Sequence, residues 1–279
     1  MMNSLEFSLA VGLFGAVAGF LGALTGLGGG VVMTPVLTLL FGIDIRYAIG
    51  ATLVSVIATS SGAASAFLKE GFSNIRIGMF LEIATTLGAV AGAFLATRIP
   101  TSAVGVILGV VLLYSALIST RPKPDQHADA TANPLAERLR LNSTYPTPHG
   151  WQPYRVQHVK TGFGLMFGAG AVSGLLGIGS GALKVLAMDH AMRIPFKVST
   201  STSNFMIGVT AAASAGVYLH RGYIDPVLAM PVMLGVSIGS LFGARHLSGA
   251  DTRVLRILFG LVIGVLALEM IYNGLKGKI

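Results

Sequence analysis

Residues 24–37 read LTGLGGGVVMTPVL, with glycine at four of the five positions from 26 to 30. Uncharged apolar stretches flank this run on both sides. In water it would form a flexible loop, but a bilayer offers no water to backbone N–H and C=O groups, so protein or an aqueous cavity must satisfy them. The glycines therefore predict the end of one helix and the start of the next. Pro35 falls in the first turns of that second helix, where its missing N–H costs little.

The composition around this stretch indicates a membrane protein. Of 279 residues, 53% are hydrophobic and 11% are charged, well under the roughly 25% charged residues of a soluble domain. Residues 7–27 carry no charge and are long enough to cross a hydrocarbon layer of about 30 Å. We expect this segment to be retained, because a cleaved signal peptide has a basic start and the first basic residue here is Arg46. The net charge of +8 lies mainly in loops, where lipid headgroups and topology explain it better than nucleic acid does.

The glycine-rich stretch belongs to an internal repeat. A shift of 151 residues aligns the two halves of the chain without a gap. Glycines recur at this shift far more often than chance allows, which indicates a duplication. The glycines of the first half that recur in the second are Gly19, Gly26, Gly28, Gly30, Gly71, Gly88, Gly92 and Gly109.

Each half contains four long apolar segments and one short one. The long segments are residues 7–27, 47–68, 77–97 and 102–119 in the first half and 161–179, 198–219, 226–246 and 254–272 in the second; the short ones are about 31–43 and 182–192. The predicted fold is an all-α polytopic membrane protein with two transmembrane repeats, residues 1–120 and 161–279. A polar linker over 121–160 joins them, mostly irregular by its composition, with one helical turn around Leu135 to Leu141.

The path of the short segments decides how the repeats are related. If they dip in and return, each half has four spans and the repeats are parallel. If they cross, each half has five and the repeats are inverted. More Lys and Arg then lie on the side of the linker, as the positive-inside rule favours for a cytoplasmic linker. We therefore expect inverted repeats of about five helical elements each, a pattern typical of secondary transporters, although channels stay open.

The second copy of the stretch, LLGIGSGALKVLAMDH at residues 175–190, has diverged from the first. Lys184 replaces Met33 and is the one basic residue well inside an apolar segment, so it is a candidate for substrate contact or charge compensation. Its alternative is a side chain that reaches the interface from a short helix. Unpaired N–H groups at a helix start bind anions without a charged side chain. The candidate backbone groups are those of Gly28, Gly29, Gly30, Gly179, Ser180 and Gly181.

Hydroxyl and amide side chains follow each glycine-rich stretch. Residues 48–62, AIGATLVSVIATSSG, pair with residues 199–213, STSTSNFMIGVTAAA. The anion-site candidates here are Thr52, Thr202, Ser203 and Asn204. They can solvate an anion, or bind neighbouring helices and backbone carbonyls. For the pair Thr59 and Thr210 we favour the packing role.

Glu82 is the one carboxylate well inside a predicted span. It is a candidate to carry a coupling proton if it faces a cavity. The alternative is a structural role, such as pairing with Arg76 or capping a helix end. The linker histidines His127, His149 and His158 lack metal-ligand spacing, so neither a metal nor a cofactor is expected.

At these residues the sequence resembles the TauE/SafE family of sulfite-exporter-like membrane proteins. The resemblance rests on GLGGGVVMTPVL at 26–37 and GIGSGALKVLAMDH at 177–190, with IGATLVSVIATSSG and TSTSNFMIGVTAAASA after them. It implies export or movement of small anions, above all sulfite and organosulfur acids, driven by an ion gradient. Second copies in the family usually carry a further Gly and a Pro where Ser180 and Leu186 stand, which implies a looser second half-site.

Together these features predict a secondary transporter of sulfite, organosulfur or carboxylate anions in the inner (plasma) membrane, with a passive anion channel as the alternative. An enzyme is not expected, because HExxH, the rhomboid-like GxSG and the GxGxxG fingerprint are all missing. The expected partners are a small anionic substrate and the lipid bilayer, with no nucleic acid. A homodimer, the particular anion and the coupling ion stay open.

Overall fold

The computed structural model describes residues 3–25, 29–69, 72–119, 133–147, 150–179, 181–246 and 252–279. In the first half the helices are α1 (Ser4–Thr25), α2 (Gly30–Leu39), α3 (Ile45–Lys69), α4 (Ile75–Ala96) and α5 (Thr101–Ser119). The linker contains α6 (Pro134–Arg138) and the strands β1 (Ser143–Thr147) and β2 (Gly150–Tyr154). The second half contains α7 (Val159–Leu176), α8 (Gly181–Leu186), the π-helical turn η1 (Ala187–Ala191), α9 (Phe196–His220), α10 (Pro226–His246) and α11 (Thr252–Leu275).

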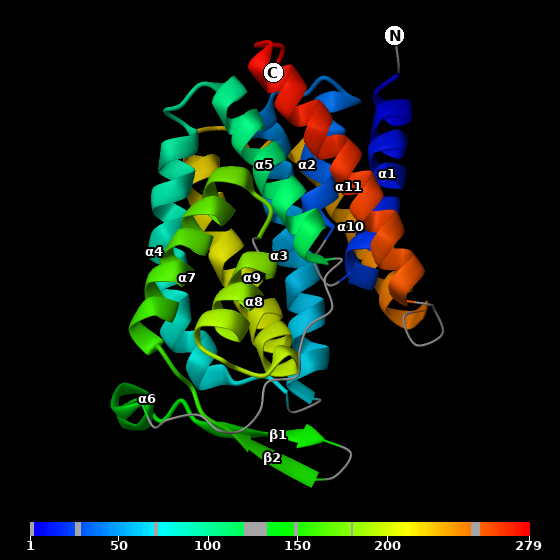
Figure 1. The fold of residues 1–279 in the computed structure, drawn as a ribbon. Coiled ribbons are helices and arrows are strands. Elements are labelled where there is room, and N and C mark those ends of the chain that lie inside the picture. The colour runs from blue at the N-terminus through cyan, green and yellow to red at the C-terminus, as the bar shows by residue number, and fades with distance from the viewer. Residues whose placement is uncertain are drawn as a thin grey trace.

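The long helices form one bundle whose two ends differ (Figure 1). The linker end carries α6 and the hairpin of β1 and β2, and the terminal end carries both chain termini. Helices α3 and α9 pack together, and the remaining long helices pair around them, α1 with α10, α4 with α7 and α5 with α11. Every one of these pairs joins one half of the chain to the other, so neither half is a separate bundle.

Contacts between helices recur at positions separated by 151 residues. A Cβ placed on Gly19 of α1 would overlap the backbone carbonyl of Val236 in α10, and one on Gly170 of α7 would overlap that of Thr85 in α4. The 151-residue shift pairs Gly19 with Gly170 and Thr85 with Val236, so the two contacts are repeat-related. Small residues let membrane helices approach closely enough for backbone contact. The duplicated glycines therefore set the spacing of both helix pairs.

Loop contacts fix the direction of each helix. The guanidinium of Arg46, at the start of α3, donates to the carbonyl of Ile99 at 2.9 Å and lies near the Tyr223 hydroxyl, so α3 begins where α4 and α9 end. The side-chain amide of Asn74, just before α4, donates to the Tyr154 hydroxyl of the hairpin, so α4 begins at the linker end. Helices α3 and α9 thus run in opposite directions, as do α4 and α10. The carbonyl of Ile279 accepts from Thr101 at 3.0 Å, which makes α5 and α11 antiparallel as well.

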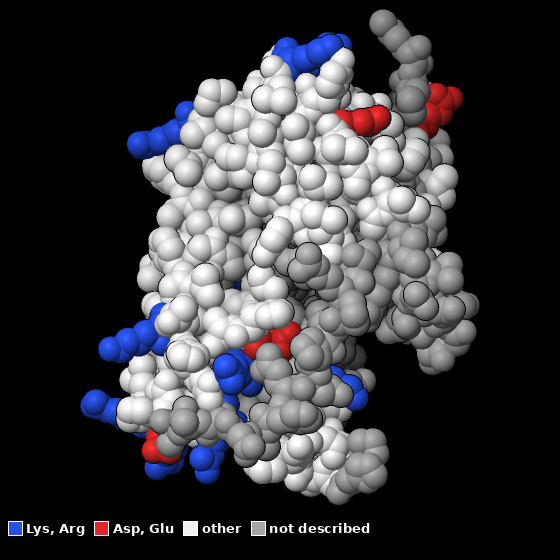
Figure 2. Space-filling model, viewed as in Figure 1, with Lys and Arg blue, Asp and Glu red and all other residues white. Residues whose placement is uncertain are grey.

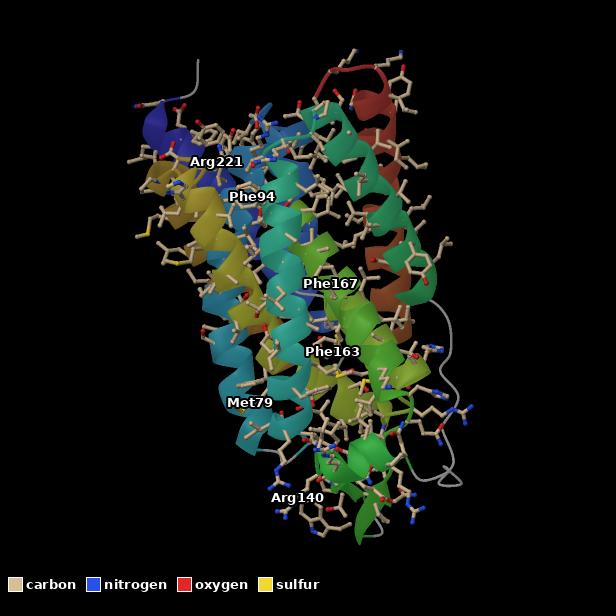
Figure 3. All side chains as sticks on the ribbon, turned by 90° about the vertical axis from the view of Figure 1, so that its left-hand side faces the viewer. Met79, Phe94, Arg140, Phe163, Phe167 and Arg221 are labelled. Atoms are coloured by element: carbon tan, nitrogen blue, oxygen red, sulfur yellow. The ribbon has the colours of Figure 1, made fainter. Side chains whose placement is uncertain are left out.

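On the face shown in Figure 2 the charged side chains gather toward the two ends of the bundle, with uncharged residues between them. On α4 the side chains that recur at helical spacing, Met79, Ile83, Leu87, Val90 and Phe94, are all exposed, and Figure 3 shows Met79 and Phe94 on this helix, with Arg221 near one end of the bundle and Arg140 at the other. Four described helices are long and apolar enough to cross a membrane, within Leu5–Gly22, Ile75–Ala96, Val159–Leu176 and Pro226–Gly243. The protein is therefore an all-α, multi-pass membrane protein.

The linker is more ordered than the sequence indicates. The expected helical turn is present as α6, capped by Asn133, whose side chain accepts from the amides of Leu135 and Ala136. The expectation of a mostly irregular chain is wrong for Ser143–Thr147 and Gly150–Tyr154, which pair as antiparallel strands. The side-chain amide of Asn74 donates to the Leu141 carbonyl at 3.2 Å and to the Tyr154 hydroxyl at 2.7 Å. These bonds to the connection before α4 order a segment whose composition is typical of a loop.

Replacing Gly92 with alanine should destabilise the protein by about 1 to 3 kcal/mol, the usual cost of overpacking. A Cβ at this position of α4 would overlap the backbone carbonyl of Ala171 in α7, which cannot move without separating the helices. Gly168, on the exposed face of α7, is the matched control because a Cβ there meets nothing within 4 Å. Thermal unfolding in detergent measures both variants. A Gly92→Ala protein as stable as Gly168→Ala would contradict close packing of α4 and α7.

Candidate functional site

The first helix break lies inside the bundle. Helix α1 ends at Thr25 and α2 begins at Gly30, as the glycines predict, with Gly29 as an N-cap that makes no side-chain hydrogen bond; Gly28 lies outside the described residues. A Cβ on Gly30 would meet Val56 Cγ2 of α3 at 2.5 Å and approach the carbonyl oxygen of Gly177 at 3.8 Å. The first glycine-rich stretch therefore lies close to the second.

The second break has a left-handed backbone on the far side of this contact. Gly177 and Gly179 have φ of 67° and 71°, a conformation that side chains rarely tolerate. Helix α8 begins at Gly181, and Ser180 lies outside the described residues. Val56 lies against both Gly30 and Gly179, while its repeat counterpart Ile207 lies against Gly179 and Gly181. The two breaks thus form one central feature, lined by repeat-related side chains.

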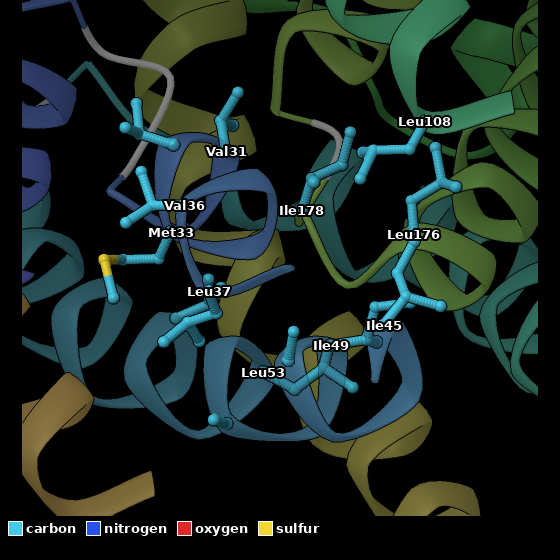
Figure 4. Close-up of a cluster of buried hydrophobic side chains, with 14 of the residues drawn as sticks. Val31, Met33, Val36, Leu37, Ile45, Ile49, Leu53, Leu108, Leu176 and Ile178 are labelled. Carbon is cyan, nitrogen blue, oxygen red and sulfur yellow. The ribbon is translucent and has the colours of Figure 1, made fainter. Parts of the chain in front are cut away.

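Apolar side chains pack around the breaks in a cluster that joins the two halves (Figure 4). Helix α2 contributes Val31, Val36 and Leu37, and the chain after α7 contributes Ile178. These residues are buried, so α2 is held at both of its ends. At the terminal end of the bundle α2 leads into α3.

The candidate hydroxyls divide between the breaks and the linker end. Thr52 Oγ1 lies 2.8 Å from Thr34 Oγ1 of α2, and Ser203 Oγ donates to the Gly181 carbonyl at 3.2 Å, so both lie at the breaks. Thr202 Oγ1 instead accepts from the backbone N–H of Asn74 at 3.0 Å, at the linker end. Asn204 is half-buried, and its amide makes no hydrogen bond among the described residues. The structure therefore brings Thr52 and Ser203 to the glycines and leaves the other two apart.

Lys184 and Glu82 are joined through one threonine hydroxyl. Lys184 Nζ lies 2.5 Å from Thr210 Oγ1 of α9, and that hydroxyl lies 2.7 Å from Glu82 Oε1 of α4. The same carboxylate oxygen accepts from Thr86 at 3.1 Å. Lys184 is fully buried, so it does not reach the interface as a solvated side chain. Glu82 takes part in this link rather than in an ion pair with Arg76, and Lys184 and Glu82 come from different halves of the chain.

Among the described residues, two N–H donors of Lys184 and one carboxylate oxygen of Glu82 have no hydrogen-bond partner. The Lys184 ammonium has three N–H donors, and Thr210 accepts one of them. Glu82 Oε2 is buried without a hydrogen-bond partner. A buried polar atom without a partner in a native protein calls for a ligand, a proton or a water molecule. The link is therefore built to hold something besides its own three side chains.

The repeat-related positions of the first half carry no charge. The counterparts of Lys184, Thr210 and Glu82 are Met33, Thr59 and Met233. Among the described residues, Thr59 Oγ1 bonds within its own helix alone, to the carbonyls of Ser55 at 3.0 Å and Val56 at 3.3 Å. The charged half of the site therefore lies on the side of α8 and the start of α4, and the repeat-related half is uncharged, with hydroxyls such as Thr34 and Thr52.

The comparisons with known proteins concern the whole chain. The family described as sulfite exporter TauE/SafE matches residues 11–270. The chain belongs to this family. It is 25% identical over 272 residues to the probable membrane transporter protein YunE of Bacillus subtilis, covering 94% of this chain and 97% of that protein. It is also 25% identical to the probable membrane transporter protein MJ0441 of Methanocaldococcus jannaschii, over 95% of this chain and 97% of that protein. No solved structure matches.

In this TauE/SafE protein the sequence hypothesis missed one central residue. Thr210 was assigned to packing, yet its hydroxyl joins Lys184 to Glu82. The repeat carries a signal for this link. Lys184 stands where the first half has Met33, and Glu82 stands where the second half has Met233. Among the described residues, no group of three His, Asp or Glu side chains could hold a metal ion.

Proposed function

We propose that this TauE/SafE protein is a secondary transporter that exports small anions, such as sulfite and organosulfur or carboxylate acids. The observation that carries the proposal is the buried Lys184, which lies one turn after the second helix break and is tied to Glu82 of the other half. A charge within membrane-spanning segments is costly and is kept where a substrate or ion path needs it. An ammonium group at the meeting point of two breaks selects an anion.

The rest of the binding shell is proposed from the same centre. Backbone groups at 28–30 and 179–181 would cradle the anion, with Thr52 and Ser203 beside them; the closeness of Gly30 to Gly177 supports one shared site. Thr202 and Asn204 would complete the shell toward the linker end, and Glu82 would carry the coupling proton. In secondary transporters such sites lie where broken helices of two repeats meet.

We further propose that residues 1–120 and 161–279 are inverted transmembrane repeats joined by a cytoplasmic linker in the plasma membrane. The opposite directions of α3 and α9 and of α4 and α10 support the inversion. The positive-inside rule supports the orientation, because the linker end is the more basic one. The described basic residues on or beside the elements of the linker end are Arg76, Arg138, Arg140, Arg155, Lys160, Arg193 and Lys197, with the acid Glu137, and those at the terminal end are Arg46, Arg98, Arg221, Lys276 and Lys278, with the acids Glu6, Asp44 and Asp225.

A passive anion channel is the second candidate. A channel keeps one continuous path, whereas the buried apolar residues packed around the two breaks, among them Val31 and Ile178, support a centre that is not permanently open. Flux that never saturates and ignores a proton gradient would favour the channel. Enzymatic activity is not proposed, because the relatives are named as membrane transporters.

Lys184→Gln should reduce sulfite flux into proteoliposomes by about tenfold or more, since one lost charge-assisted hydrogen bond with the substrate is worth about 1.5 to 3 kcal/mol. Glutamine keeps a donor but removes the charge that attracts the anion. Lys160→Gln, at the exposed start of α7, is the matched control and should keep the flux of the unaltered protein. Equal flux from Lys184→Gln would remove Lys184 from the transport mechanism. Absence of flux for sulfite, taurine, sulfoacetate and simple carboxylates in the unaltered protein would defeat the proposal as a whole.

A further inference from the structure

We infer that the substrate anion and Glu82 compete for Lys184, so that each monovalent anion is transported together with one proton in an electroneutral step. This inference rests on the proposed function and adds its coupling. The link from Lys184 through Thr210 to Glu82 is its structural basis.

The first step of the argument is charge balance. Lys184 is fully buried, and a buried charge needs a partner of opposite sign. Without substrate that partner is the Glu82 carboxylate, reached through the Thr210 hydroxyl. When an anion binds the ammonium, a carboxylate left beside it would be an unpaired second negative charge. A proton from water on Glu82 Oε2 removes that charge, and the site is neutral before and after.

The second step is geometry. Among the described residues, Lys184 and Glu82 form no direct ion pair, because the Thr210 hydroxyl lies between them. An anion can contact the ammonium directly, which makes it the stronger partner at short range. Two of the three Lys184 donors are not used by Thr210, and Glu82 Oε2 has no partner, so the anion and the proton each have a place.

Within the part of the chain that the structure describes, one charged group acts on Glu82. Lys184 is the charged group that acts on it, with hydrogen bonds from the threonines beside it. The helices packed against α4 are α7 and α9. No hydrogen bond or ion pair to Glu82 is made, among the described residues, by the other titratable groups of α4, α7 and α9 or by His190 of η1: Arg76, Lys160, Lys197, Tyr218, His220 and His190. Asp189 of η1 is buried and has an interaction of its own.

The third step is position. Glu82 lies eight residues, about 12 Å of helix, beyond Asn74 at the linker end. The counterparts toward the terminal end, Met33 and Met233, bind neither a proton nor an anion. Coupling therefore occurs on the linker side of the centre alone. The direction of net transport follows the sum of the anion and proton gradients, and an anion leaves the cell when its own gradient is the larger.

The test uses methanesulfonate, which stays a monovalent anion between pH 5 and 8. Binding to the detergent-solubilised protein should take up one proton per anion, read with a pH indicator in weak buffer. Above the pKa of the coupling group, affinity should fall about tenfold per pH unit, as linkage to one proton requires. In proteoliposomes a pH gradient should drive uptake, and a potassium diffusion potential should not.

Variants separate coupling from folding. Glu82→Gln should bind methanesulfonate without proton uptake and without pH dependence. Thr210→Val should change the pH profile of binding, because Thr210 positions both charges, whereas Thr59→Val, its repeat counterpart, should leave the profile unchanged. If Glu82→Gln does not fold, the Glu82→Gln/Lys184→Met double variant should fold without binding the anion.

The outcomes distinguish the two proposals. Methanesulfonate binding or flux that takes up no proton and responds to the diffusion potential would overturn the coupling and leave anion transport standing. Proton uptake that persists in Glu82→Gln would also overturn it. Absence of methanesulfonate binding would defeat the coupling, while sulfite flux would still decide the proposed function.

Discussion

Glu82→Gln should lower the free energy of unfolding by about 3 kcal/mol, the lower part of the range for removing one partner of a buried pair, because Glu82 is only half-buried. The substitution keeps the size of the side chain and its bond from Thr210, but it leaves the Lys184 ammonium buried without a counter-charge. For a chain of this length the melting temperature in detergent should fall by about 6 to 12 °C. Methanesulfonate should restore part of the loss, since it supplies the missing negative charge.

Adding Lys184→Met to Glu82→Gln should recover most of this stability. Methionine is the residue that the first half carries at the same repeat position, Met33, where it is fully buried. Glu269→Gln, exposed on α11, is the control for losing a carboxylate and should leave the melting temperature unchanged. A double variant no more stable than Glu82→Gln would show that the two charges are not energetically coupled.

The sequence predicts the helices well because membrane spans are encoded by long apolar runs. The expected segments 47–68 and 226–246 agree closely with α3 and α10. The glycines predict both helix breaks because few other residues adopt the left-handed backbone that Gly177 and Gly179 have. The hairpin of β1 and β2 was missed because contacts to Asn74, distant in sequence, order it.

The candidate site could be predicted only in part. Lys184 and Glu82 stand out singly as charges within apolar segments, but their connection depends on how α8, α9 and α4 pack. Thr59 and Thr210 look alike in sequence, and both bond to a carbonyl of their own helix, Thr210 to that of Met206 at 3.0 Å. What distinguishes Thr210 is its neighbours, which belong to two other helices. No sequence pattern within α9 indicates these neighbours.

Replacing Ser73 and Ser201 with cysteine should give a protein whose transport is blocked by oxidation and restored by a reductant. The two hydroxyl oxygens lie 2.5 Å apart, so two sulfur atoms there can approach the roughly 2.05 Å of a disulfide. Ser73 lies in the connection before α4, and Ser201 lies in the first turns of α9. The disulfide would tie the two halves together at the linker end. The natural chain has no Cys, so no other thiol interferes.

Sulfite flux should fall to the level of protein-free vesicles on oxidation, because a transporter with alternating access has to open the linker end once in each cycle. Each single cysteine variant should keep its flux under the same oxidant, which controls for the loss of either serine. At the terminal end the repeat counterparts of Ser201 and Ser73 are Gly50 and Ile224, which lie close together but carry no hydroxyl. A fully cross-linked protein that still transports sulfite at the original rate would mean that the linker end need not open, and would favour a channel-like path over alternating access.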